Sequence, residues 1–82
     1  MSDAALKDKL RTIISEVSEV EEIPDETPFK ELGIDSMMAI EIVAEVERTY
    51  KLSIPEEDLK ELTNFTRVYE LVRDKLAAHA AE

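Results

Sequence analysis

Side chains that perform covalent chemistry are scarce in this chain, and Ser36 is the one with informative surroundings. It follows Gly33-Ile34-Asp35 and precedes a long segment rich in apolar residues. A nucleophilic serine needs a nearby base and an oxyanion hole. The single histidine, His79, lies near the end of the last predicted helix, and the chain has no cysteine. We therefore expect that Ser36 is not a catalytic nucleophile and that the chain is not an enzyme.

The pattern around Ser36 is typical of a helix start. Asp35 is a good N-cap, because its carboxylate can accept hydrogen bonds from the first backbone N–H groups of a helix. Gly33 permits the sharp turn that leads into the helix. Ser36 then takes the first helical position, where the positive end of the helix dipole favours a phosphate ester. Taken alone, a serine at this position is best explained as part of the helix cap.

Acidic side chains dominate the middle of the sequence. The chain carries 20 acidic and 10 basic residues, a net charge of −10, and the whole excess lies within residues 19–61. This charge argues against nucleic acid and anionic membranes as partners, and it favours a basic protein surface. The acids lack the D-x-D-x-D-G spacing of a calcium loop, so we predict no metal site.

Apolar periodicity predicts an all-α fold with three main helices and one short helix. The first helix has an apolar stripe at i, i+4, i+7 spacing, begins at a cap formed by Ser2 or Asp3, and fades near Ser18. A connection of 17 residues then leads to Ile34. It is long for a small domain, but apolar side chains can anchor it to the core. These anchors are Ile23, Phe29, Leu32 and Ile34.

The remaining helices follow from capping signals. The second helix begins at Ser36 and runs for roughly 15 residues. Pro55 is expected at the first position of the short third helix, which reaches Leu62. Thr63 or Asn64 caps the last helix, whose buried stripe comprises Phe65, Val68, Val72 and Leu76.

The second predicted helix has more apolar surface than a small core can easily bury. One face, with Ile42, Val46 and Tyr50, suffices for the core. A second stripe is rotated away from it, and it either packs under the long connection or forms an exposed seam that binds partner proteins. This stripe comprises Met37, Ile40 and Ala44, with Met38 between the two faces and Glu41, Glu45, Glu47 and Arg48 at its border.

The stretch Leu32-Gly33-Ile34-Asp35-Ser36-Met37 resembles the L-G-x-D-S-L/M motif of acyl carrier proteins. The resemblance continues through Glu41 and Glu47 to Ile54-Pro55-Glu56-Glu57 and the Thr63 region. It covers essentially the whole chain, with the same length, acidity and order of helices. Because the D-S pair stands at the head of an acidic helix, with I-P-E-E eighteen residues later, the match is specific.

This resemblance implies a small four-helix bundle that forms a single acyl carrier domain over residues 1–82. In the family, the serine matching Ser36 receives 4′-phosphopantetheine from coenzyme A through a separate magnesium-dependent phosphopantetheinyl transferase. The thiol of that arm holds acyl groups as thioesters, while the chemistry belongs to partner enzymes. The implied role is to present acyl intermediates to fatty-acid, lipid or polyketide biosynthetic enzymes.

The resemblance also implies a partner surface around the second helix. Asp35, Glu41 and Glu47 are expected to meet arginines and lysines of acyl-transferring and chain-elongating enzymes. No apolar run is long enough to cross a bilayer, and the first residues lack the apolar stretch of a secretory signal, so we expect a cytoplasmic protein without membrane insertion. We also expect a monomer. The expected partner-binding residues are Met37, Met38, Ile40, Glu41, Ala44, Glu47 and Arg48.

Two positions depart from housekeeping fatty-acid carriers and favour a specialised carrier. Met38 is apolar where those carriers have a polar or acidic residue, and Arg48 adds a positive charge to an acidic helix. Two alternatives stay open: a carrier of aminoacyl or peptidyl groups, against which the acidity counts, and an acidic helical interaction module with an unmodified serine. A fatty or lipid-like acyl cargo is expected, whereas the identity of the acyl chain, its length and the pathway stay open.

Overall fold

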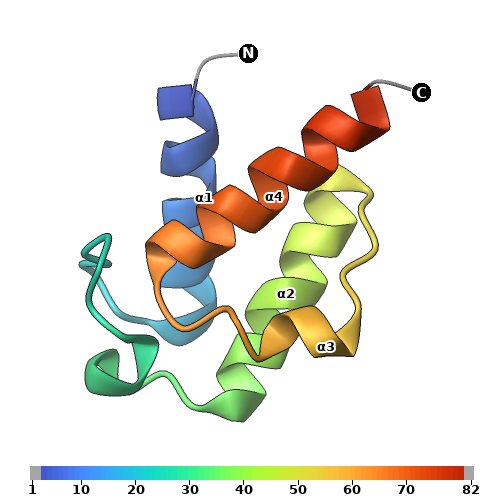
Figure 1. Ribbon diagram of the computed structural model, residues 1–82. Coiled ribbons are helices and arrows are strands. Elements are labelled where there is room, and N and C mark those ends of the chain that lie inside the picture. The colour runs from blue at the N-terminus through green and yellow to red at the C-terminus, as the bar shows by residue number, and fades with distance from the viewer. Residues whose placement is uncertain (1–2, 81–82) are drawn as a thin grey trace.

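Four α-helices and one 3₁₀ helix make up the regular structure of the computed structural model, which describes residues 3–80 and the side chains of residues 4–78 (Figure 1). Within these residues no strand is present, so the predicted all-α class is confirmed. The predicted cap at Ser2 or Asp3 lies outside the described side chains. The elements are α1 (Asp3–Ser18), η1 (Phe29–Leu32), α2 (Ser36–Tyr50), α3 (Glu56–Leu59) and α4 (Phe65–Ala80).

The core forms where α1 packs against both α2 and α4. Leu10, Ile14 and Val72 are fully buried there, and Val46 and Phe65 are 1% exposed. Burying a side chain of this size stabilises the fold by about 1.5–3 kcal/mol relative to leaving it in water. The three main helices are therefore held together mainly by their apolar faces.

The core face predicted for the second helix is confirmed. Ile42, Val43 and Val46 are buried, and Tyr50 is half-buried at the end of α2. Burial raises the pKa of Tyr50 above its ordinary value, so its phenol remains neutral.

The long connection, residues 19–35, is ordered by its apolar side chains. It runs from the foot of α1 to the foot of α2 (cyan to green in Figure 1). Three of the four predicted anchors, Ile23, Phe29 and Ile34, are buried, and Leu32 packs partly against the core. Residues 29–32 form η1, so part of the connection is helical.

Arg11 of α1 ties this connection to two helices at once. Its guanidinium donates hydrogen bonds to the backbone oxygen of Ile23 and, over 2.6 Å, to Oδ1 of Asp25. The same group lies over the Phe65 ring at the start of α4, with its central carbon 4.2 Å from the ring centre. The planar guanidinium can stack on a ring and donate several hydrogen bonds at once, so this one side chain joins α1, the connection and the start of α4.

Backbone bonds complete the attachment of the connection to α4. The carbonyl oxygen of Asp25 accepts from both the N–H and the hydroxyl of Thr66, each over 3.0 Å. The Phe29 N–H donates to the Thr63 carbonyl over 2.8 Å. The segment before α2 is therefore fixed to the N-terminal end of α4.

The region between α2 and α4 differs in part from the prediction. Pro55 is the N-cap of α3 in extended conformation, not its first helical residue, and α3 ends at Leu59. Beyond it, the N–H of Leu62 donates to the carbonyl of Leu59, a three-residue spacing that tightens the chain into a turn. Asn64 caps α4, because its Oδ1 accepts the Arg67 N–H over 2.9 Å.

Most acidic side chains of residues 19–61 are exposed, and few have a basic partner. In this segment Asp25, Glu45 and Asp58 form ion pairs, with Arg11, Arg48 and Lys75 respectively. Among the described side chains, the acids near Lys30, Lys51 and Lys60 form no ion pair with those lysines. Like charges therefore repel one another across this half of the molecule.

We predict that Arg11→Ala lowers the free energy of unfolding by about 2–4 kcal/mol, because two charge-assisted hydrogen bonds and one cation–π contact are lost. Arg11→Lys should recover only part of the loss, since an ammonium group cannot fork and stack in the same way. Urea denaturation measures both values. Lys9→Ala, on the exposed side of α1, is the control and should change the value by less than about 0.5 kcal/mol. Equal effects of Arg11→Ala and Lys9→Ala would contradict the role of Arg11.

Screening the acidic half should stabilise the protein. We predict that the melting temperature rises on adding sodium chloride or magnesium chloride, because screening weakens the repulsion among exposed carboxylates. A variant with Glu21→Gln and Glu22→Gln should melt higher than the parent at low salt and respond less to salt. Circular dichroism melting curves over a salt series provide the measurement, and a melting temperature independent of salt would contradict the prediction.

Candidate functional site

Ser36 is the first residue of α2, and its side chain is exposed as predicted. Asp35 caps the helix: its Oδ1 accepts the Met38 N–H over 2.9 Å. The backbone carbonyl of the same residue accepts the Ala39 N–H, also over 2.9 Å. A side-chain cap of this kind contributes about 1 kcal/mol to helix stability. The predicted role of Asp35 as helix cap is confirmed.

The chain immediately before Ser36 is held rigidly. Ile34 is buried, and its N–H donates to the Phe29 carbonyl over 3.0 Å. Gly33 ends η1 at φ 81°, in the left-handed region that is strained for residues with a Cβ. Because a buried anchor precedes Asp35 and a capped helix follows it, the serine hydroxyl stands at a fixed point on the surface.

The surroundings of Ser36 fit a phosphodiester better than a catalytic site. Among the described residues its hydroxyl has no hydrogen-bond partner, so no base is positioned to activate it. Asp35 accepts from the N–H groups of Met38 and Ala39, which leaves those of Ser36 and Met37 directed toward the outside. Two such donors at the positive end of a helix favour the charge of a phosphate. The side chain of His79 lies outside the described residues.

Among the described residues, no group of three or more histidine, cysteine, aspartate or glutamate side chains is arranged to hold a metal ion. In the same part of the chain, no helix is both long enough and apolar enough to cross a membrane.

The second apolar stripe of α2 forms an exposed seam and does not pack under the connection. Met37 is 73% exposed and Ile40 is 57% exposed, and Ala44 is exposed beside them. We call these three residues the apolar seam. Met38, which we expected in the partner surface, is half-buried and packs against the core. The cause is helix geometry, since Met38 lies on the flank of α2 that turns toward Ile42.

The charged border of the seam is more varied than its sequence suggests. Glu41 is exposed, whereas Glu45 forms an ion pair with Arg48 over 3.1 Å. Glu47, expected to meet partner enzymes, is half-buried, and its Oε2 accepts the Ile54 N–H over 2.8 Å. That bond holds the segment between α2 and α3 against the end of α2. No spacing pattern in the sequence indicates a bond between a helical carboxylate and a backbone group seven residues later.

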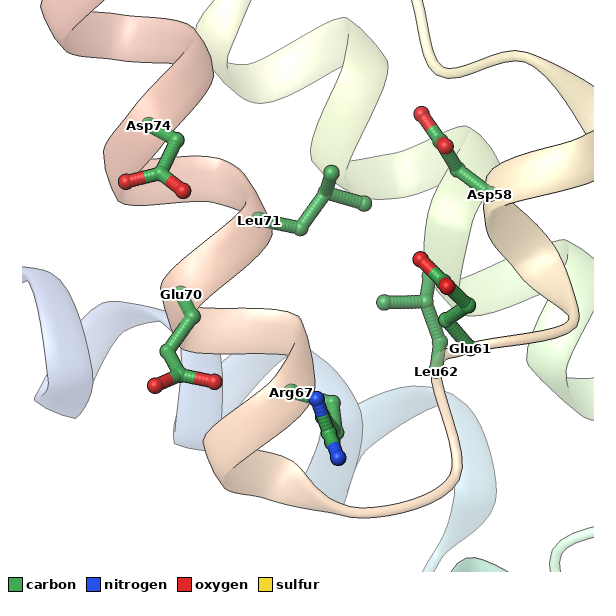
Figure 2. A pocket seen from close by; sticks show the side chains of 7 residues that line it. All are labelled: Asp58, Glu61, Leu62, Arg67, Glu70, Leu71 and Asp74. Carbon is green, nitrogen blue, oxygen red and sulfur yellow. The ribbon is translucent and has the colours of Figure 1, made fainter.

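A small cleft lies between the end of α3 and α4, and sequence reasoning did not find it. Its volume is about 180 Å³, and Figure 2 shows carboxylates on both of its sides with Leu71 pointing between them. Asp58 at its edge pairs with Lys75 of α4 over 3.5 Å, an ion pair that joins the two helices. Neither Ser36 nor the apolar seam contributes to the cleft, which is lined by Asp58, Glu61, Leu62, Arg67, Glu70, Leu71 and Asp74.

Comparison with known proteins identifies relatives along most of the chain. The family described as "Phosphopantetheine attachment site" matches residues 8–72. The chain is 36% identical over 75 residues to polyketide-8 synthase acyl carrier protein 1 of Streptomyces avermitilis, covering 88% of this chain and 89% of that protein. It is 34% identical over 77 residues to a non-reducing polyketide synthase of Emericella nidulans, where it covers 92% of this chain and spans only 3% of the synthase.

The fold comparison agrees with the sequence comparison. The crystal structure of an acyl carrier protein from Thermotoga maritima superimposes with a TM-score of 0.81 at 30% identity, covering 95% of this chain and 94% of that one. The predicted family resemblance and the predicted covalent group, 4′-phosphopantetheine, are thereby confirmed. This chain belongs to the phosphopantetheine attachment-site family and has the fold of its acyl carrier proteins.

Proposed function

We propose that this chain carries acyl intermediates of a polyketide pathway as thioesters on 4′-phosphopantetheine attached to Ser36. The observation that carries the proposal is an exposed serine on a capped, rigidly anchored helix start, inside the segment that matches the attachment-site family. The Streptomyces and Emericella relatives are named for polyketide synthesis, which favours that pathway over fatty-acid synthesis and over an aminoacyl carrier.

For attachment, this chain needs only to make the Ser36 hydroxyl accessible to the transferase. A separate phosphopantetheinyl transferase removes the proton of the Ser36 hydroxyl, whose oxygen forms a new bond to the β-phosphorus of coenzyme A. The pyrophosphate bond breaks, and adenosine 3′,5′-bisphosphate leaves with the electron pair. The bound group supplies the thiol that this cysteine-free chain lacks. The outward N–H groups of Ser36 and Met37 favour the resulting phosphodiester.

Partner enzymes are proposed to bind the exposed side of α2. The apolar seam begins directly after Ser36, so an enzyme that covers it also reaches the attached arm. Glu41 and Asp35 add negative charge that suits arginines and lysines of acyl-transferring and elongating enzymes. Glu47 also has a structural role, because one oxygen of its half-buried carboxylate, Oε2, accepts the Ile54 N–H.

We further infer that residues 1–82 act as one carrier domain, which works as a monomer in the cytoplasm. The single-domain part of this inference is supported by one apolar cluster among the described side chains, which draws residues from α1, α2, α4 and the long connection.

Ser36→Ala should abolish attachment without affecting the fold, because the hydroxyl has no structural partner among the described residues. The protein is incubated with coenzyme A, magnesium and a broad-specificity phosphopantetheinyl transferase, and its intact mass is measured. The parent should gain one phosphopantetheinyl group. Ser53→Ala, which removes an exposed serine between α2 and α3, is the matched control and should load like the parent.

Two outcomes would contradict this assignment. A folded parent protein that gains no mass, beside an active control carrier, would leave the acidic interaction module as the better function. Mass gain by Ser36→Ala would show that another side chain is modified. Loss of helical circular dichroism in Ser36→Ala would instead show that this serine supports the fold.

Substituting the two isoleucines of α2 distinguishes a role in partner binding from a role in core packing. Ile40→Ala should change the free energy of unfolding by less than about 0.5 kcal/mol, because that side chain is already exposed. Ile42→Ala removes a side chain that is 2% exposed and should cost about 2–5 kcal/mol. Urea denaturation measures both, and transfer of an acyl group to the loaded protein should slow for Ile40→Ala. Comparable destabilisation by the two substitutions would show that the seam is part of the core.

A further inference from the structure

The exposed side of α2 is not uniformly acidic. Successive residues of an α-helix are rotated by about 100°, so residues 37, 44 and 48 lie almost in line on one face. Met37 is at the serine end of that line, and Arg48 is about 16 Å farther along it. The Arg48 side chain is 74% exposed, as freely accessible as Met37 at 73%. A positive charge therefore ends the apolar seam.

The acidic groups near Arg48 do not cancel its effect on a partner. In its ion pair with Glu45 the Arg48 side chain is 74% exposed and the Glu45 side chain 40%, and pairs this accessible to water hold their members only weakly. Glu47 is turned to the Ile54 N–H. Lys51 follows directly after α2 and is exposed, and among the described side chains it forms no ion pair. The charge along the seam therefore changes sign: Glu41 beside its middle is negative, whereas Arg48 and Lys51 beyond its far end are positive.

A local explanation for Arg48 is the helix dipole. A basic residue in the last turn of a helix is favoured by the partial negative charge there. The dipole does not require that this residue continue the line of the apolar seam, where any enzyme bound to Met37, Ile40 and Ala44 must meet it. Because Arg48 lies in line with the seam, it also affects the binding of partner enzymes, and the helix dipole alone does not account for that position.

From this arrangement we propose that Arg48 selects partner enzymes. The enzyme that fits has an apolar groove for the seam, a basic side chain facing Glu41 and a carboxylate facing Arg48. An enzyme whose groove is bordered by basic residues alone meets like charge at this end and binds more slowly. The inference rests on the proposed carrier function and assigns to it the charge pattern of its partners.

The test uses loaded protein and a malonyl transferase whose docking groove is bordered only by lysine and arginine. Four carriers are compared: the parent, Arg48→Glu, Arg48→Gln, and Lys9→Glu, which reverses an exposed charge on α1 and controls for net charge. At low salt, kcat/KM for malonyl transfer should rise about threefold or more for Arg48→Glu. Arg48→Gln should give a smaller rise and Lys9→Glu none, and the gain should shrink at high salt.

A reciprocal change in the transferase locates the contact. The lysines that border its groove are replaced by glutamate one at a time, which gives a series of transferase variants. For one of these variants, kcat/KM should be higher with the parent carrier than with Arg48→Glu, the reverse of the order found with the unmodified transferase. Equal rates for all four carriers, or the same gain for Lys9→Glu as for Arg48→Glu, would overturn the proposal. Intact mass before the assay keeps the two hypotheses apart: a parent that does not load refutes the carrier function, whereas four loaded carriers with equal rates refute only the role of Arg48.

Discussion

The guanidinium of Arg11 is the contact on which the site depends. It joins α1 to the backbone of the long connection and to the aromatic ring at the start of α4. The connection has few regular backbone bonds of its own, so without such ties the entropy of seventeen flexible residues would oppose its order. Once it is fixed, η1 can form, Ile34 can be buried and Asp35 can cap α2. A cation that lies 25 residues before the serine thus helps to hold the segment that leads to it.

The second constraint is that the two faces of α2 have different roles, one in the core and one at the surface. Its inner face meets α1 and supplies much of the core, so the outer face can carry apolar residues that lie largely outside the core. Exposed methionine and isoleucine side chains carry a risk of aggregation, which the surrounding negative charge reduces by repulsion between molecules. That same charge destabilises the folded state, because its acids lie in one half of the chain. Solubility with an apolar seam is thus obtained at the expense of stability.

Local signals in the sequence predicted the helices and the serine well, and long-range contacts account for what they missed. Asp35 as cap, Ser36 as an exposed first residue and the buried face of α2 follow from capping preference and from a period of 3.6 residues, which act over a few positions. The bond from Glu47 to the Ile54 N–H and the early end of α3 depend on how a turn folds back on α2. In the sequence, Arg11 is one of several charged residues in a first helix with no net charge. Its neighbours in the sequence do not indicate that it contacts Asp25 or Phe65.

A carrier must combine a fixed attachment point with weak, exchangeable binding, since each partner has to release it. The serine end of α2 supplies the fixed point through its buried anchor and cap. In the docking proposed above, exchangeability follows from the small size of the seam, because burial of three side chains gives limited affinity and the border charges act mainly on the rate of encounter. In such an interface, one charge in line with the seam changes the association rates of different partners without lowering the dissociation rate of any complex. For a surface this small, selectivity is therefore more readily obtained from the sign of its border charges than from additional apolar contact.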